Sequence, residues 1–271
     1  MSSENPRKVR AWLLALGKEA PPACIELPEG VFELDHIFKH DFFAFTARYT
    51  GQNGRVLLKI GRKASLFGLP LGWIGRLHAG HESAAYTALA DLDVVPRFLG
   101  RWGRHGFVHE FIEGRPLRKG DPVPDDFFDR LRTGLSEIHA RKMAYVDLEK
   151  CENVVVGDNG RPYLVDFQIA WRWPWRRGGD LWPARWLRGR LQASDWYHVR
   201  KLQRRVRPDQ MNAEELAASY GKPAHIRFWG KLTRPLTLLR RRTLTALGSR
   251  REQGERGAVY ESARRDDASG G

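Results

Sequence analysis

Short runs of alternating apolar and polar residues fill much of the first half of the chain. Two of them, residues 42–49 and 56–60, flank a polar segment at 50–54 that contains two glycines. Alternation on both sides of a short glycine-containing segment is typical of two strands joined as a β-hairpin. The pattern therefore predicts a hairpin whose second strand carries Lys59 inside an apolar run.

A helical period replaces this alternation in residues 81–92, an alanine-rich segment with apolar side chains at Ala85, Leu89 and Leu92. The spacing predicts a helix that follows the hairpin. Glu82 is expected near the start of this helix, where the helix dipole favours an acidic side chain.

Two short apolar runs follow, at 94–99 and 106–112, and predict two more strands. Residues 113–117 end the second run with a glycine and a proline. Because these residues interrupt regular structure, we interpret 113–117 as a hinge between two parts of the molecule. Residues 1–22, which end in two prolines, are interpreted as a polar lead with one amphipathic turn.

Apolar residues at helical spacing also run through 125–142 and lead into two acidic motifs. Asp147 and Asn153 stand before one apolar strand, and Asp166 stands at the end of the next, after a turn at 158–160. Carboxylate and amide oxygens are hard ligands that magnesium prefers, and an acid among apolar strand residues is costly to bury unless it binds something. The motifs predict a site in which Asp147 accepts a hydroxyl proton while Asn153 and Asp166 bind magnesium.

Transfer of a phosphoryl group requires a protein to neutralise a triphosphate, to hold magnesium and to orient an acceptor hydroxyl. Lys59 is expected to contact the phosphates, and Glu82 is expected to hold that lysine in place. These residues and the two acidic motifs form a chemically complete set for an ATP-dependent phosphotransferase. Cys151 and His139 are interpreted as bystanders, because no catalytic arrangement accompanies either of them.

In this order along the chain, the residues resemble the protein-kinase-like superfamily, and most of all the bacterial lipopolysaccharide-core and Kdo kinases and related small atypical kinases. The resemblance covers roughly residues 38–200. It maps Lys59 to the strand lysine, Glu82 to its helix partner, and Glu110 and Ile112 to the hinge that binds the nucleotide. It implies ATP and Mg²⁺ as cofactors.

The same resemblance implies an α+β, two-lobed protein-kinase-like fold: a small N-terminal antiparallel sheet with one helix, followed by a mostly helical C-terminal lobe. Asp147 and Asn153 correspond to the catalytic loop, and Asp166 corresponds to the acid of the metal-binding motif. Asp195 resembles the acid of a later helix that braces the catalytic loop by accepting its backbone N–H groups.

The chain departs from the protein-kinase pattern at its phosphate cover and at two motif residues. It has no G-x-G-x-x-G, so residues 40–46 would have to cover the phosphates with backbone amides of a bulkier turn. Tyr145 stands where protein kinases usually carry histidine, and Gln168 replaces the glycine that follows Asp166-Phe167. Because glutamine restricts the backbone more than glycine does, no conventional activation switch is expected.

A further departure is the spacing of the catalytic loop. Asn153 lies six residues after Asp147, where the usual spacing is five. Either the loop bulges by one residue, or Glu149 or Glu152 takes the place of Asn153 as a metal ligand.

The distribution of charge along the chain indicates an anionic partner. The net charge is +14, and residues 172–251 hold 20 Lys and Arg against 5 Asp and Glu, so the excess lies in this block. Seven of the ten tryptophans fall within 171–229. Arginine mixed with tryptophan is typical of an interfacial anchor, which favours an anionic membrane surface. An internal core with a basic rim and a nucleic-acid site are the alternatives, and no RNA-binding motif supports the latter.

The expected boundaries are an N-terminal extension at 1–22, an N-lobe at 23–113, a C-lobe with the basic Trp/Arg-rich part at 114–247, and a disordered tail at 248–271. Cys24 and Cys151 lack the spacing of metal ligands, which favours a reducing compartment. No run reaches the roughly 18 apolar residues of a membrane span. We therefore expect a cytoplasmic protein that is peripheral at the inner face of the membrane.

The sequence thus predicts transfer of the γ-phosphate of ATP to a hydroxyl, with a lipid-linked sugar such as lipopolysaccharide core as the favoured acceptor. Protein serine or threonine is the alternative acceptor. A pseudokinase that acts as a nucleotide-binding or scaffolding module is the alternative from another class. A small-molecule kinase of the aminoglycoside or choline type would need an acidic acceptor pocket, and the basic carboxyl part weighs against it.

Overall fold

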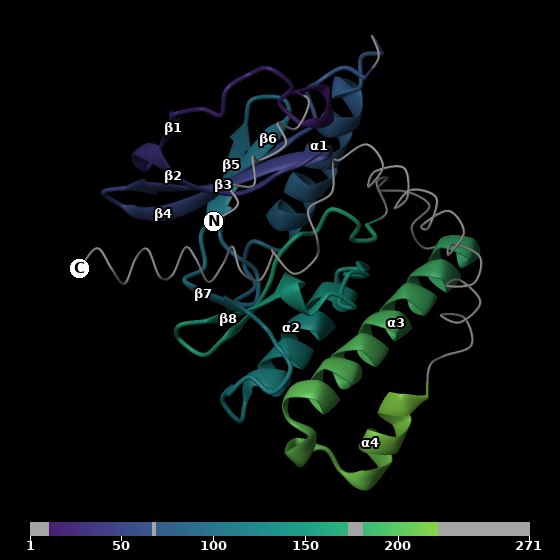
Figure 1. Cartoon of the computed structure of the whole chain (residues 1–271). Coiled ribbons are helices and arrows are strands. Elements are labelled where there is room, and N and C mark those ends of the chain that lie inside the picture. The colour runs from purple at the N-terminus through teal and green to yellow at the C-terminus, as the bar shows by residue number, and fades with distance from the viewer. Residues whose placement is uncertain (1–10, 67–68, 173–180, 222–271) are drawn as a thin grey trace, which may run out of the picture. The chain divides into compact units, whose positions relative to one another are not determined.

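Six strands form the largest sheet in the computed structural model, which describes residues 11–66, 69–172 and 181–221 (Figure 1). The strands lie in the order β1-β2-β3-β4-β6-β5, and the pairings from β1 to β4 and between β4 and β6 are antiparallel. Their bounds are β1 Cys24–Leu27, β2 Gly30–His40, β3 Ala44–Gly51, β4 Gly54–Gly61, β5 Phe98–Trp102 and β6 Gly106–Glu110.

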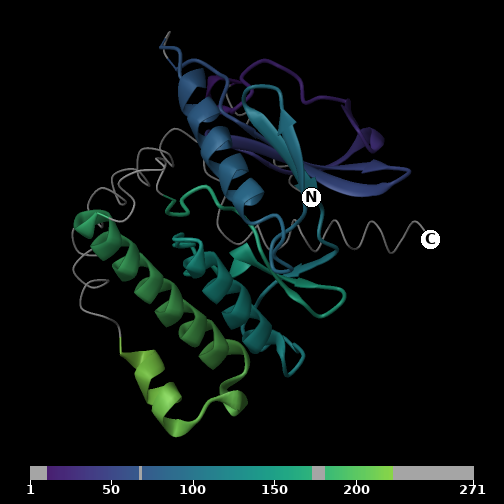
Figure 2. The ribbon, with the colours of Figure 1, turned by 180° about the vertical axis from the view of Figure 1, so that it is seen from behind.

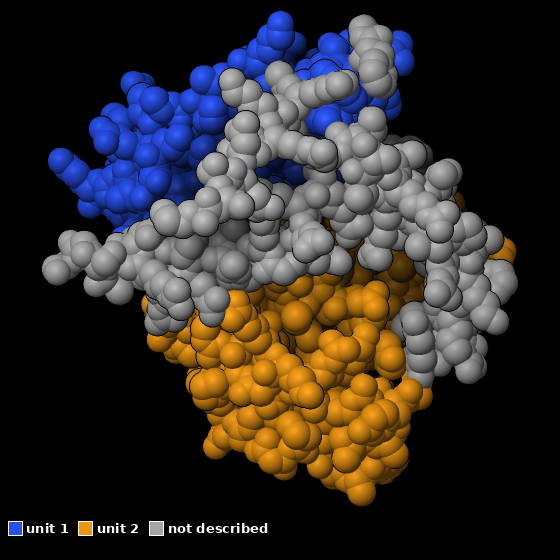
Figure 3. Space-filling model, in the orientation of Figure 1, with its two compact units in different colours: residues 1–81, 99–111, 236–271 blue, residues 82–98, 112–235 orange. Residues whose placement is uncertain are grey.

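The predicted hairpin is confirmed as β3 and β4, with Thr46 opposite Lys59. The fold is mixed α+β, as predicted. Two compact units divide the described residues: 11–66, 69–81 and 99–111 belong to unit 1, and 82–98, 112–172 and 181–221 belong to unit 2 (Figure 3).

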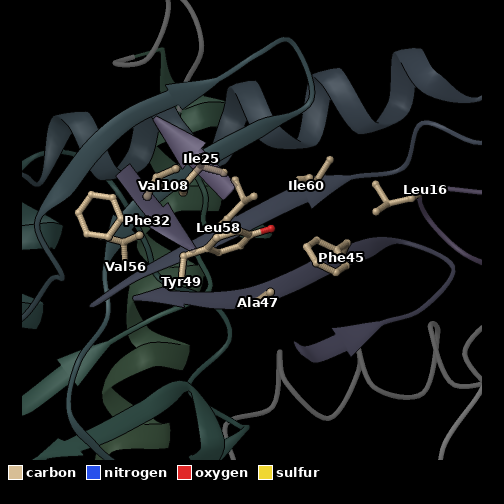
Figure 4. Close-up of a cluster of buried hydrophobic side chains, with 10 residues drawn as sticks. All are labelled: Leu16, Ile25, Phe32, Phe45, Ala47, Tyr49, Val56, Leu58, Ile60 and Val108. Carbon is tan, nitrogen blue, oxygen red and sulfur yellow. The ribbon is translucent and has the colours of Figure 1, made fainter. Parts of the chain in front are cut away.

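One cluster of buried apolar side chains forms the core of the large sheet (Figure 4). The strand residues in it lie at alternating positions because successive side chains of a strand point to opposite faces. The cluster contains Leu16, Ile25, Phe32, Phe45, Ala47, Tyr49, Val56, Leu58, Ile60 and Val108.

The segment expected to be a polar lead contributes to this core. A short 3-10 helix, η1 (Ala11–Leu13), is followed by Leu16, which is 3% exposed. The N–H groups of Lys63 and Ala64 both donate to the carbonyl of Ala15, and the N–H of Ala15 donates to Asp41. These bonds fasten the segment to the large sheet, and the short helix with its buried Leu13 and Leu16 matches the amphipathic turn that was expected here.

Helix α1 (Gly72–Ala88) begins nine residues before the predicted helix, so Glu82 lies in its middle and not near its start. Glycines hid the first half of the helix from the sequence pattern. Gly75 has a packing role, because a Cβ at this position would come within 2.1 Å of the carbonyl oxygen of Arg62, just beyond β4. The helix thus uses glycine for close approach to a strand, at the expense of helical propensity.

Unit 2 combines the remaining helices with a three-stranded antiparallel sheet in the order β7-β8-β9. Figure 2 shows the elements from behind. Their bounds are β7 Gly114–Pro116, α2 Phe127–Ala140, η2 Cys151–Asn153, β8 Val154–Gly157, β9 Pro162–Leu164, α3 Trp182–Val206, η3 Pro208–Gln210 and α4 Ala213–Tyr220.

Three boundaries differ from the sequence predictions. The chain passes from unit 1 to unit 2 between Phe111 and Ile112, and most of the segment interpreted as a hinge is strand β7, which pairs with β8. The strand predicted at 94–99 begins only at Phe98. The run 106–112 is a strand only as far as Glu110.

Parts of the basic, tryptophan-rich block, with Trp173, Trp175 and Trp229, and the tail expected at 248–271 lie outside the described residues. Within the described ranges, no helix has both the length and the apolar character needed to cross a membrane.

Candidate active site

The loop after α2 brings Asn153 onto Asp147 in spite of their six-residue spacing. Two consecutive turns take up the additional residue: Lys150 N–H donates to the carbonyl of Asp147 at 3.3 Å, and Asn153 N–H donates to the carbonyl of Lys150 at 3.2 Å. The side-chain amide of Asn153 then donates to Oδ2 of Asp147 at 2.9 Å and to its carbonyl at 3.2 Å. The loop thus accommodates the six-residue spacing by a bulge, which is the first of the two alternatives that the sequence left open.

The other alternative assigned the role of Asn153 to Glu149 or Glu152. The carboxylate of Glu149 is 67% exposed and lies 3.6 Å from Lys201 on α3. Asn153 is 5% exposed and contacts Asp147 directly. The geometry thus favours Asn153 over Glu149 as the partner of Asp147.

Lys150 is a site residue that the sequence reasoning missed. Its Nζ lies 2.5 Å from Oδ2 of Asp147, and its side chain is 45% exposed. The available signal was its position, since it is the lysine that shares the loop with Asp147 and Asn153. Asp147 therefore has a cationic partner as well as an amide donor.

The pKa of Asp147 is raised above its ordinary value. Burial is the largest cause and disfavours the charged carboxylate. Lys150 and the Asn153 amide act in the opposite direction, and the negative charge of Asp166 adds to the effect of burial. A carboxylate with a raised pKa is a better proton acceptor near neutral pH than an ordinary aspartate.

Asp195 of α3 braces the backbone that precedes Asp147, as the resemblance implied. Its buried carboxylate accepts the N–H of Tyr145 at 2.8 Å and the N–H of Val146 at 2.7 Å. His139 places Nε2 at 3.0 Å from the same carboxylate, so it acts in this network and not as a base for the site.

These bonds hold Val146 in a strained conformation, with φ at 72°. A β-branched residue rarely adopts the left-handed region, and such strain persists only where the surroundings enforce it. The strained residue lies directly before Asp147. The hydrogen bonds from Tyr145 and Val146 to Asp195 therefore fix the backbone from which the side chain of Asp147 projects.

Tyr145 ties the two acidic motifs together. Its hydroxyl donates to the carbonyl of Val165 and lies 3.4 Å from the carbonyl of Asn153, while Val165 N–H donates to the Asn153 carbonyl at 3.0 Å. Asp166 follows with φ at 64° and is half-buried. The segment that carries Asp166 is thus fastened to the end of the Asp147 loop.

Buried aromatic rings continue this connection into α1. Tyr145 packs edge-on against Phe167 at 5.1 Å between ring centres, and Phe167 packs edge-on against Tyr86 of α1 at 5.1 Å. Tyr86 in turn stacks on Phe98 at 6.2 Å. Burial, and after it the charges of Asp166 and Asp147, raise the pKa of Tyr145 well above its ordinary value, so its hydroxyl remains a donor.

Lys59 lies in unit 1, half-buried on β4 opposite Thr46 and Phe107. The pKa of His78 on α1 is lowered by burial and then by the positive charge of Lys59, which brings this charge near α1. Glu82 on the same helix is 2% exposed, and a carboxylate at that depth is costly unless it is paired. Lys59 and Glu82 belong to different units, and their pairing stays a prediction.

The two residues expected to contact the nucleotide flank the passage between the units. Glu110 ends β6 and is exposed, with its carbonyl 2.7 Å from Nδ1 of His109. Phe111 N–H donates to the carbonyl of Arg55 at 3.1 Å. Ile112 is half-buried at the start of unit 2. Their contact with ATP stays a prediction.

The turn between β2 and β3 was expected to cover the phosphates with its backbone amides. The side chain of Asp41, a residue of this turn, bonds two of those amides. Oδ1 of Asp41 accepts the N–H of Phe43 at 2.9 Å and of Ala44 at 3.0 Å. The N–H of Asp41 donates to the carbonyl of Ala44 at 3.1 Å. These amides are therefore engaged inside the turn in this conformation.

The donor set of the site suits Mg²⁺. Asp147, Asn153 and Asp166 carry the carboxylate and amide oxygens that hard cations prefer, and Mg²⁺ in nucleotide enzymes uses few protein ligands because phosphate oxygens and water supply the rest. No group of three or more His, Cys, Asp or Glu side chains within the described ranges is arranged to hold a metal ion. The binding of magnesium by Asn153 and Asp166 stays a prediction.

Comparison with known proteins adds no family to this geometry. A scan against models of protein families finds none that matches the chain, and a search of curated proteins finds no match. The function must be argued from the residues of the site.

Proposed function

We propose that this chain is an ATP-dependent phosphotransferase with a two-lobed, protein-kinase-like fold, which transfers the γ-phosphate of ATP to a hydroxyl. The hydrogen bond from Asn153 to Asp147 is the observation that carries the proposal. It unites a buried carboxylate of raised pKa with a metal-ligand amide, in a loop fastened to the segment of Asp166. A base beside metal ligands is the arrangement that phosphoryl transfer needs.

In the proposed reaction, Asp147 accepts the proton of the acceptor hydroxyl as its oxygen attacks the γ-phosphorus. The bond from the γ-phosphorus to the bridging oxygen breaks, and ADP leaves with that electron pair. Bound Mg²⁺ would neutralise charge on the β- and γ-phosphates. Asn153 and Asp166 would hold it through side-chain oxygens, and Lys150, beside Asp147, would offset the charge of the transferred group.

Unit 1 would supply the contacts to the nucleotide. Lys59 would bind the phosphates and Glu82 would orient that lysine. The backbone of Glu110 and Ile112 would bind the base of ATP. These roles follow from the resemblance and from the position of Lys59 near α1.

A lipid-linked sugar, such as that of lipopolysaccharide core, is the acceptor we propose, met at the cytoplasmic face of the membrane by a peripheral protein. The basic, tryptophan-rich residues after 171 support a partner that is anionic and interfacial. Protein serine or threonine is the alternative acceptor, because fold does not determine substrate.

A pseudokinase is a second candidate that one observation favours. The amides expected to cover the phosphates are bonded to Asp41. A turn closed in this way would suit a module that binds nucleotide weakly or serves as a scaffold.

Incubation of the full chain with γ-labelled ATP, Mg²⁺ and either a lipopolysaccharide-core glycolipid or a serine-rich protein tests the proposal. Label in the glycolipid is the expected result. Label in the protein alone would mean that the acceptor is a protein serine or threonine and not a lipid-linked sugar. Stabilisation of the chain by ATP without label in either acceptor, and without ADP formation, would support the pseudokinase.

A further inference from the structure

Helix α3 presents two different sides to its surroundings. One side is buried and includes Ala184, Asp195, Val199, Leu202 and Val206. The 3.6-residue period places another set of residues opposite them. These residues are all exposed, and we call them the exposed α3 face: Trp182, Arg185, Trp186, Gly189, Arg190 and Ala193.

The exposed α3 face extends about 17 Å along the first half of the helix, from Trp182 to Ala193, at 1.5 Å per residue. Beyond it, Trp196 packs against His139 and Tyr197 is buried. Helix α4 packs beside the C-terminal part of α3, where Arg204 bonds Ser219 (Figures 1 and 2). Among the described residues, a Cβ on Gly189 would meet nothing within 4 Å.

Large apolar side chains are exposed at the start of the helix. Trp182 is 73% exposed, Trp186 is 57% exposed, and the neighbouring Leu181 is 64% exposed. Single exposed apolar residues are common on proteins, but adjacent ones in a polar frame mark interaction surfaces.

The charge of this region has one sign. Residues 181–194 contain Arg185, Arg188 and Arg190 and no Asp or Glu. The guanidinium of Arg190 lies 5.4 Å from the ring centre of Trp186. The first acid of the helix, Asp195, is on the buried side and is bonded to the catalytic loop. Cations and indole rings therefore occur together in a segment whose sequence, from 181 to 194, contains no acidic residue.

We propose that the exposed α3 face is a docking surface for an anionic membrane. Arginine binds lipid phosphates, and tryptophan lies at the boundary between headgroups and acyl chains. A helix of this kind binds in the plane of the interface. Leu181 favours lipid over nucleic acid, because an aliphatic side chain enters hydrocarbon but does not stack on bases as an aromatic ring does.

This inference deepens the proposed function, because a lipid-linked acceptor would be met at the same surface. Lipid binding and phosphotransfer are nevertheless separate measurements. ATP turnover is assayed without vesicles on each preparation, so the failure of one idea is distinguishable from the failure of the other.

Co-sedimentation of the full chain with phosphatidylcholine vesicles, with or without phosphatidylglycerol, tests the proposal at low and high salt. The variants are Trp182→Ala/Trp186→Ala and Arg185→Gln/Arg190→Gln. The matched control is Trp73→Ala, since Trp73 is 53% exposed on α1. Thermal unfolding confirms that each variant is folded.

The wild type is expected to bind the anionic vesicles, and more weakly at high salt. Loss of both tryptophans should weaken binding about tenfold or more. Loss of both arginines should weaken it by a similar factor at low salt, since each contributes about fivefold near an anionic surface. Trp73→Ala should bind as the wild type.

Three results would overturn the proposal. The first is wild-type protein that fails to bind anionic vesicles. The second is a double-tryptophan variant that binds as tightly as the wild type. The third is a wild type that prefers a single-stranded oligonucleotide or self-associates through the exposed α3 face in place of binding vesicles.

Discussion

The side-chain amide of Asn153 donates a 2.9 Å hydrogen bond to Oδ2 of Asp147, across six residues of a loop that turns twice between them. The nitrogen of the amide faces the carboxylate, so its oxygen can serve another ligand. Asp147 and Asn153 are therefore in direct contact, and the longer spacing between them does not prevent this contact.

Asn153→Ala should weaken the binding of the Mg²⁺ that supports ATP turnover, because it removes the proposed oxygen ligand and a donor to Asp147. We expect half-saturation by Mg²⁺ to rise about tenfold or more. A magnesium titration of the rate measures this. Asn159→Ala is the control, since Asn159 bonds Tyr163 in a surface turn. The same Mg²⁺ concentration at half-saturation for both variants would mean that Asn153 is not a metal ligand.

Asp147→Asn should abolish turnover and yet raise the melting temperature at neutral pH. The pKa of Asp147 is higher in the folded protein than in the unfolded chain. The folded state thus binds more protons between the two pKa values, and stability falls as pH rises through that interval. The Asp147→Asn side chain does not ionise, so the variant does not lose this stability. Its higher melting temperature should therefore disappear below the ordinary carboxyl pKa, where Asp147 is protonated in both states of the wild type. Thermal unfolding over a pH series measures it, and a lower melting temperature at neutral pH would count against the raised pKa.

Lys150→Met should move the acidic limb of the rate profile to higher pH. Lys150 lowers the pKa of Asp147, against the larger effect of burial, so its removal lets that pKa rise further. The dependence of kcat on pH shows the shift. Lys201→Met is the matched control, because Lys201 pairs with Glu149 of the same loop. A limb that does not move relative to this control would mean that another group accepts the proton.

Asp195→Asn should destabilise the fold and the site together. The amide replaces one of two acceptor oxygens, so one of the N–H groups of Tyr145 and Val146 loses its partner at a cost of about 1–3 kcal/mol. Urea unfolding measures the loss, with Asp93→Asn as control, since the side chain of Asp93 is 88% exposed. Val146→Gly should stabilise the wild type by about 1 kcal/mol by relieving the positive φ, and should stabilise the Asp195→Asn variant by less. Equal stabilisation in both backgrounds would mean that the bonds to Asp195 do not enforce the strain.

The sequence predicts an element well where one side of it is apolar and the other polar. The hairpin β3–β4 and helix α2 were found in this way. Strand β2 was not predicted, although Phe32 and Leu34 alternate with Glu33 and Asp35 along it as the two sides of a half-buried strand do. The start of α1 was missed because Gly75 serves close packing and not helix formation.

The site was predictable in its residue types and not in its connections. Asp147, Asn153 and Asp166 stand in an order that indicates metal and base chemistry. The contact of Lys150 with Asp147 depends on the turns of the loop, and the bond from Tyr145 to Val165 depends on tertiary packing. The position of Asp195, about fifty residues away, came only from the resemblance and was confirmed by its hydrogen bonds.

The most direct test of the account is ADP formation from ATP and Mg²⁺, in the presence of the lipopolysaccharide-core glycolipid as acceptor, by purified wild type, Asp147→Ala and Asp166→Ala, with Glu149→Ala as a control in the same loop. The account predicts turnover by the wild type and the control, and a loss of about a hundredfold or more in each aspartate variant. Equal turnover in all four proteins, or none in the wild type, would contradict it.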